Sequence, residues 1–133
     1  MNDPGASASF MVELSSAYNN VGNVLANQAN AARDRNKALQ AIAFTEKAEV
    51  ILQGLAEGDP SNAFYWSNLA IDDYNLSVLN ASVGNKSAQQ AYATKSQQAQ
   101  QRAQAAAPSA TAQQTPSTSQ TTQSQQTPPA QQQ

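Results

Sequence analysis

The feature that most constrains this fold is a series of apolar residues separated by three or four positions. The series begins after Phe10 and runs through Leu14, Tyr18, Val21, Leu25, Ala32, Leu39 and Ile42, in steps of three and four or their sums. Such spacing places the apolar side chains on one face of an α-helix, in the heptad-like pattern of helices that pack on other helices. It predicts one long helix from Phe10 to about Leu55, with a shift in register near Ile42.

A sharp corner is predicted over residues 58–62, which are Gly58-Asp59-Pro60-Ser61-Asn62. Asp is a favoured N-cap, and Pro suits the first position of a helix because its missing N–H needs no partner there. We therefore expect Asp59 to cap a second helix that begins near Pro60.

The second helix has its own apolar series. Its members are Tyr65 or Trp66, followed by Leu69, Leu76, Leu79 and Val83. Between Leu69 and Leu76 the three-four spacing falls on Asp72 or Asp73 instead of an apolar residue. Gly84 then weakens the helix by about 1 kcal/mol relative to Ala. Residues 86–107 are rich in Ala and Gln, which favour helix, but they offer little to bury.

These patterns predict an all-α fold, an antiparallel helical hairpin of two long helices over residues 10–107. Residues 1–9 are expected to form a flexible N-terminus. Residues 108–133 contain no charged, aromatic or large aliphatic residue, so burial cannot offset the entropy lost on ordering. A disordered Gln/Thr/Ser/Pro-rich tail is expected there.

Composition argues against several classes of function. The net charge is −2, with seven Lys and Arg in 133 residues, so nucleic-acid binding is not expected. The chain has no Cys and no His, which removes thiolate nucleophiles and the usual zinc ligands. We expect no catalytic residue, no cofactor and no metal. No apolar run is long enough to span a bilayer.

In a chain without His, carboxylates are the main candidates for acid–base chemistry or metal binding. Asp72 and Asp73 are adjacent, so on a helix they point about 100° apart, and we expect one in solvent and the other on the seam. Glu46 and Glu49 share one helix face, where a solvated surface is the expected reading.

A two-helix hairpin leaves part of each apolar face uncovered, which predicts contact with another copy of the chain or with another helical protein. Three consecutive aromatic residues, Phe64-Tyr65-Trp66, cannot all face one partner helix. Gly22 lies inside a predicted helix, where a close approach of another helix is one explanation. The predicted interface residues are Tyr65, Trp66, Leu69, Leu76 and Leu79.

The Gly58-Asp59-Pro60-Ser61-Asn62 corner and the segment Ile71-Asp72-Asp73-Tyr74-Asn75-Leu76 resemble the needle and inner-rod subunits of type III secretion systems. Trp66 near the turn is similar to exported hairpins of the WXG type, although Ser67-Asn68 follows it without the glycine. The Ala/Gln/Asn-rich first helix also resembles R-body subunits and phage internal proteins. Each resemblance implies a structural, assembling role.

The sequence thus predicts a non-catalytic structural subunit or accessory of a self-assembling bacterial or phage structure, such as a secretion filament, an R-body or a virion. The alternative is a soluble helical adaptor or chaperone-like binding module. No Sec-type signal is evident, so export by another route, association with a virion, or a cytoplasmic location are all open.

Overall fold

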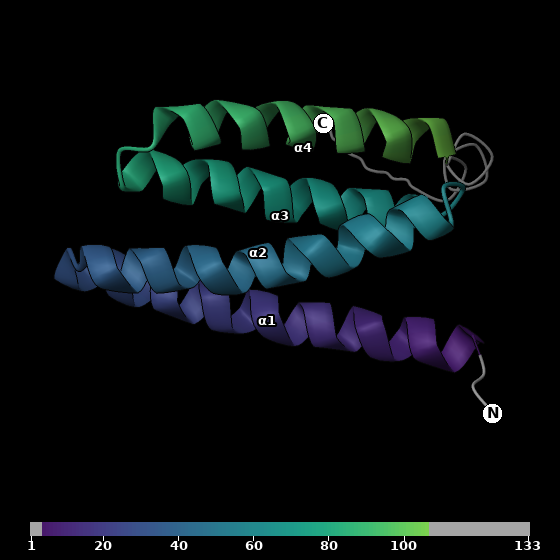
Figure 1. Cartoon of the computed structure of the whole chain (residues 1–133), viewed down its shortest axis with the longest axis horizontal. Coiled ribbons are helices and arrows are strands. Elements are labelled where there is room, and N and C mark those ends of the chain that lie inside the picture. Colours follow the sequence, from purple (N-terminus) through teal and green to yellow (C-terminus); the bar gives the residue numbers. More distant parts are fainter. Residues whose placement is uncertain (1–3, 107–133) are drawn as a thin grey trace, which may run out of the picture.

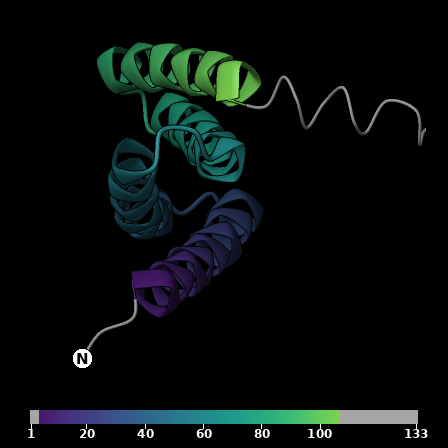
Figure 2. The same ribbon diagram turned by 90° about the vertical axis from the view of Figure 1, so that its right-hand side faces the viewer.

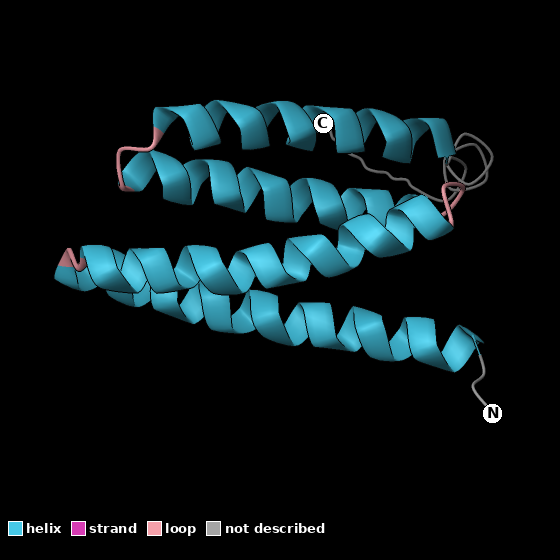
Figure 3. Cartoon of the chain, in the orientation of Figure 1, coloured by secondary structure: helices cyan, strands magenta, loops and turns pink. Residues whose placement is uncertain are grey.

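The computed structural model describes residues 4–106 and contains four α-helices and no strand in that range. The helices are α1 (Pro4–Ala32), α2 (Arg35–Gly58), α3 (Ala63–Ser82) and α4 (Lys86–Ala106). Neighbouring helices run antiparallel, and α2 packs against both α1 and α3 (Figures 1 and 3). An end-on view shows the α1–α2 hairpin stacked on the α3–α4 hairpin (Figure 2).

The all-α prediction is confirmed for the described residues, but the prediction of two long helices is wrong. Helix α1 also begins at Pro4, inside the segment 1–9 that was predicted to be flexible. The predicted tail, residues 108–133, lies outside the described residues.

The first long helix is broken at Arg33, which adopts the left-handed conformation with φ of 53°. The N–H of Asp34 donates back to the carbonyl of Ala29 at 2.9 Å. This is the hydrogen bond that usually ends a helix at a glycine, here with Arg33 in the glycine's place. The Asp34 carboxylate then accepts hydrogen bonds from the N–H groups of Asn36 and Lys37 and caps α2. One residue therefore both ends α1 and starts α2.

The second predicted helix is broken at Gly84, where φ is 82°. The N–H of Asn85 donates to the carbonyl of Asn80 at 2.9 Å, and the N–H of Gly84 donates to the carbonyl of Ala81 at 3.1 Å. This pair of bonds is the Schellman arrangement. Asn85 then accepts a hydrogen bond from the N–H of Ala88 at 3.1 Å and begins α4.

A turn between Gly58 and Ala63 lies at the predicted corner, but its cap is different. Asn62, not Asp59, caps α3, because its side-chain oxygen accepts from the N–H of Phe64 at 3.0 Å. Pro60 lies before the helix, and its carbonyl accepts a hydrogen bond from the indole N–H of Trp66 at 2.9 Å. This bond ties the turn to the core.

Small residues let the first hairpin pack closely. Ser15, Gly22 and Ala29, spaced by seven, are buried on α1. A Cβ added to Gly22 would lie 2.5 Å from Thr45 Oγ1 and 3.3 Å from the Ala41 carbonyl oxygen, so the backbones of α1 and α2 approach closely there. The close approach suggested by Gly22 is confirmed.

The predicted α1 seam is offset from the buried one. Leu14, Tyr18 and Leu25 are only half-buried, and Val21 is exposed. The large apolar side chains of α1 therefore flank a seam of small residues and keep much of their surface in water.

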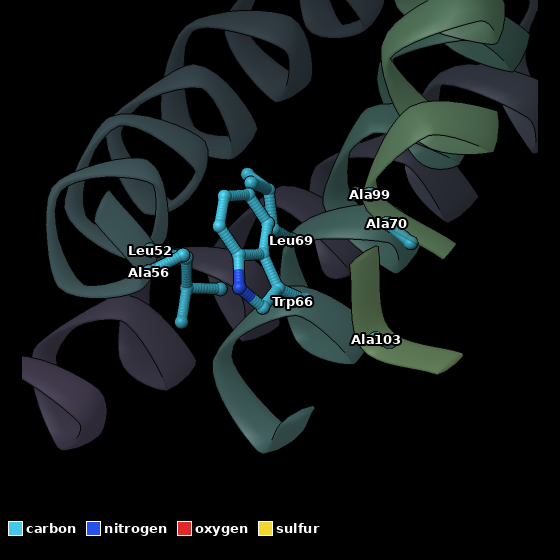
Figure 4. Packing of buried hydrophobic residues seen from close by; sticks show 7 residues of the cluster. All are labelled: Leu52, Ala56, Trp66, Leu69, Ala70, Ala99 and Ala103. Atoms are coloured by element: carbon cyan, nitrogen blue, oxygen red, sulfur yellow. The ribbon is translucent and has the colours of Figure 1, made fainter. Parts of the chain in front are cut away.

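The main core lies between α2, α3 and α4. Figure 4 shows it as a cluster in which Trp66 and Leu69 of α3 fill the space beside small residues of the other helices. Its buried members are Leu52, Ala56, Trp66, Leu69, Ala70, Ala99 and Ala103. On α4 the small residues Ser96, Ala99 and Ala103 face α3, and the Ser96 hydroxyl donates to the Ala70 carbonyl at 2.8 Å. Small side chains thus let the polar α4 pack tightly.

Candidate functional site

The structure places the predicted interface residues mainly inside the chain. Trp66, Leu69 and Leu76 are 4%, 2% and 0% exposed, whereas Tyr65 and Leu79 are half-buried. The guanidinium of Arg102 lies 4.9 Å from the centre of the Trp66 ring system. An intermolecular contact through these five residues stays a prediction, and three of them are already covered by helices of their own chain.

A second apolar stripe lies on the opposite side of α3. Ile71 and Tyr74 are 53% and 60% exposed, and Phe64 and Val78 are also more than half exposed. The four residues are separated by seven, three and four positions, which is heptad spacing along one helix face. We call Phe64, Ile71, Tyr74 and Val78 the outer stripe of α3.

Beside the outer stripe, α3 and α4 form a groove of about 680 Å³. Its walls carry no charged residue and come from these two helices alone; they are Ser67, Ala70, Ile71, Tyr74, Gln100, Ala103 and Gln104. Buried Ala70 and Ala103 form part of the lining, and because no charged residue lines the groove, an occupant would desolvate no charge in its walls.

Helix α1 carries a comparable exposed stripe. Phe10, Ala17, Val21, Val24 and Ala31 are all exposed, and four of them follow at intervals of seven. The only charged residue in α1 is Glu13. We call these five residues the outer stripe of α1. The molecule therefore presents one nearly uncharged apolar helix face at each hairpin.

A cluster of ionisable groups is buried between the helices. Glu49, Asp72 and Asp73 are 4%, 2% and 1% exposed, and the Lys95 ammonium forms an ion pair with Glu49. The expectation that one of the two aspartates faces solvent is therefore wrong, and so is the expectation of a solvated surface at Glu49. Glu46 stays exposed and accepts a hydrogen bond from the Tyr92 hydroxyl at 3.2 Å.

Burial of these aspartates changes how they titrate. Desolvation, and then the neighbouring Glu49 carboxyl, raise the pKa of Asp73 from 3.8 to about 8. Desolvation, followed by the charge of Glu49, raises the pKa of Asp72 from 3.8 to about 7. Burial beside the Glu49 carboxyl therefore favours the protonated form of Asp73.

The two aspartates open onto different cavities, as expected for adjacent helical residues. Asp73 lines a cavity of about 180 Å³ that also contains Lys95 and Arg102. Asp72 lines a cavity of about 140 Å³ on the other side, between α1, α2 and α3. Within residues 4–106, no group of three or more acidic side chains is placed to hold a metal ion.

No helix in the described part of the chain is long and apolar enough to cross a membrane. No family model matches the sequence, and no similar curated protein or solved structure was found. The resemblances to secretion substrates, R-body subunits and phage proteins therefore stay predictions.

Proposed function

We propose that this protein is a non-catalytic structural subunit that assembles with copies of itself by placing the outer stripe of α1 in the α3–α4 groove of the next copy. The observation that carries the proposal is the pair of exposed heptad-spaced stripes, one on each hairpin. The proposal that this assembly is a bacterial or phage structure rests on the sequence resemblances alone.

Matching chemistry supports a second copy as the occupant of the groove. The groove is lined without charge, and α1 has Glu13 as its only charged residue along 29 residues. Covering an apolar side chain such as Val, Ile or Phe is worth about 1.5 to 3 kcal/mol. Several such side chains on each stripe supply a favourable contact, which is opposed by the desolvation of Glu13, because Glu13 lies between Phe10 and Ala17 on the outer stripe of α1.

The geometry of this contact has a consequence for the kind of assembly. The stripe and the groove are different surfaces, so each copy has one of each to offer. Head-to-tail contacts of this kind generate rings or open filaments rather than closed two-fold dimers. Within one chain the two hairpins already pack through α2 and α3, which supports packing of further hairpins by the same kind of contact.

The rival function is an adaptor that holds an apolar helix of another protein in the same groove. The outer stripe of α1 favours self-assembly, since an adaptor with one binding groove has no need of a second exposed apolar face.

Sedimentation velocity over a wide concentration range tests the proposal. The wild-type chain should associate reversibly, and Tyr74→Ser should weaken this association at least tenfold. Val50→Ser is the matched control, because Val50 is 66% exposed on α2 and belongs to neither stripe. Equal effects of the two substitutions, or a wild-type chain that stays monomeric at millimolar concentration, would contradict the proposal.

A further inference from the structure

Three carboxyl groups are buried at the joint between the two hairpins. The α1–α2 and α3–α4 hairpins are connected by the turn after Gly58 and meet where α2 packs on α3. Glu49 on α2 and Asp72 and Asp73 on α3 are each no more than 4% exposed. Buried carboxylates are costly unless they are paired, so the balance of charge here bears directly on how firmly the hairpins hold together.

A single ammonium group serves two of these carboxyls. Lys95 of α4 forms an ion pair with Glu49 and also lines the cavity onto which Asp73 opens. Neither carboxyl oxygen of Asp73 receives a hydrogen bond from another group among the described residues. A proton on Asp73 supplies the missing donor, and the neighbouring Glu49 carboxylate is an acceptor for it.

The other charged groups around Asp73 do not balance this cluster. Arg102 of α4 and Glu57 of α2 line the same cavity, and their charges offset each other. Tyr92 of α4 is neutral, because burial and then nearby carboxylates raise its pKa to about 12. On the α1 side, the cavity beside Asp72 is lined by no other charged residue. The joint therefore holds more carboxyls than cations, and a bound proton reduces the excess.

The protonation of Asp73 is linked to the closure of the joint. Burial, followed by the hydrogen bond and charge of Glu49, raises the pKa of Asp73 from its ordinary value of 3.8 to about 8. Separating α2 from α3 would place this carboxyl in water and return its pKa to the ordinary range. Opening therefore releases a proton to solvent between these two pH values, so rising pH favours the open form. Because the proton leaves as the joint opens, the inaccessibility of the Asp73 oxygens in the closed form does not prevent its release.

Each hairpin has contacts of its own that do not cross the joint. In the first hairpin the rings of Tyr18 and Phe44 pack with their centroids 6.2 Å apart. In the second the Ser77 hydroxyl of α3 donates to the Gln89 carbonyl of α4 at 3.0 Å. Since these contacts lie within one hairpin, α2 can separate from α3 while both hairpins stay paired.

We propose that protonated Asp73 is a latch between the two hairpins, and that the joint between α2 and α3 opens as Asp73 loses its proton above neutral pH. The turn over residues 59–62 is the hinge, because it is the segment that connects the two hairpins. The open form uncovers Leu69 and Leu76 on α3, two residues that the sequence predicts to contact another chain. This latch acts within one chain and does not depend on the proposed contact between copies.

Distances between two spin labels, measured by electron spin resonance, test the proposal, and the chain has no cysteine of its own to interfere with labelling. Labels on Gln40→Cys of α2 and Gln90→Cys of α4 report on the joint, since both residues are exposed and lie near the helix ends remote from the hinge (Figure 1). Opening releases one proton, so the ratio of open to closed chains should rise about tenfold per pH unit up to about pH 8. A longer distance should therefore gain at least about tenfold in population between pH 6 and pH 9.

Variants of the labelled chain locate the effect. Asp73→Asn should keep the joint closed at pH 9, because its amide can donate to Glu49 without titrating. Glu13→Gln removes an exposed carboxylate of α1 and is the matched control, which should open like the wild-type chain. Labels on Asn23→Cys and Gln40→Cys, both in the first hairpin, should keep their distance at both pH values.

An unchanged distance between residues 40 and 90 from pH 6 to pH 9 would overturn the proposal, and so would opening of Asp73→Asn to the wild-type extent. Loss of helicity by circular dichroism together with the longer distance would overturn it as well, because the whole chain would then be unfolding. The labelled chain is diluted with unlabelled chain at low micromolar concentration, so that contacts between copies do not contribute. Failure here therefore leaves the proposed assembly standing, and a chain that never associates leaves the latch standing.

Discussion

The two faces of α3 carry similar apolar patterns but have different surroundings. The inner face, with Trp66, Leu69 and Leu76, is covered by α2 and α4, whereas the outer stripe has more than half of each side chain in water. Both faces follow steps of three, four or seven. One helix thus has two apolar faces and the chain covers one, which leaves the other for a contact outside the molecule.

The largest effect should come from damaging the inner face. Trp66→Ala removes a buried indole and its hydrogen bond to the Pro60 carbonyl, and it should lower the free energy of unfolding by about 3 to 5 kcal/mol. Denaturant unfolding followed by circular dichroism measures this. A loss of association with unchanged stability would place Trp66 on the outer face instead.

Gly22→Ala should have the next largest effect. It extends the comparison of buried and exposed faces to the seam between α1 and α2. The added methyl group would clash with Thr45, which is buried, and force α1 away from α2. We expect a loss of about 1 to 3 kcal/mol. The same denaturant experiment applies, with Gly54→Ala as the control, since a Cβ there meets nothing within 4 Å. Equal outcomes for both glycines would contradict the close approach.

The buried carboxyls of the inner face predict a dependence of stability on pH. The folded pKa values of Asp72 and Asp73, about 7 and about 8, lie above the ordinary value of 3.8. The folded state therefore holds more protons than the unfolded state between these values, so stability should fall as pH rises from about 4 to about 8. A Tm higher by at least about 5 °C at pH 5 than at pH 8.5 is expected.

The variant Asp73→Asn checks the origin of this slope. It should stabilise the chain at pH 8.5 and flatten the change between pH 5 and 8.5, since the amide needs no proton. An unchanged slope in this variant would show that Asp73 is not the titrating group.

The smallest effect on stability should come from the outer stripe. Ile71→Ser removes a side chain that is 53% exposed and should change the free energy of unfolding by no more than about 0.5 kcal/mol at concentrations where the chain is monomeric. Thermal unfolding at low micromolar concentration measures it. A loss as large as that of Gly22→Ala would mean that the outer stripe is part of the core.

The helical class and the corner near residues 58–62 were predictable from apolar spacing and from Asp59-Pro60. The break at Arg33 was not, because neither Gly nor Pro marks it and Arg rarely adopts positive φ. Asp34 was the available signal, since an Asp inside a predicted helix is a good N-cap. Gly84 was predicted only to weaken the second helix, because a glycine inside a helical pattern can also be tolerated there without ending the helix.

The site was predictable only in part. The spacing placed Leu69 and Leu76 on one face with either Tyr65 or Trp66, and the structure buries Trp66 there. The partner that covers this face includes α4, whose Ser96, Ala99 and Ala103 look too small to form a core. Burial of Asp72 and Asp73 could not be inferred for the same reason, since it depends on helices packing on both sides of α3. The outer stripe of α3 could not be told from a core face by spacing alone, because Phe64, Ile71, Tyr74 and Val78 follow the same helical spacing as the buried residues.

Mixing two complementary variants in the analytical ultracentrifuge tests head-to-tail assembly most directly. Tyr74→Asp blocks the α3–α4 groove, and Val24→Asp blocks the outer stripe of α1. Each variant alone should be monomeric, and an equimolar mixture should form a one-to-one dimer. The intact stripe of Tyr74→Asp then fills the intact groove of Val24→Asp, and the dimer grows no further because only the two blocked surfaces remain free. A mixture that stays monomeric while the wild-type chain associates, or variants that associate as well as the wild type, would contradict this mode of assembly.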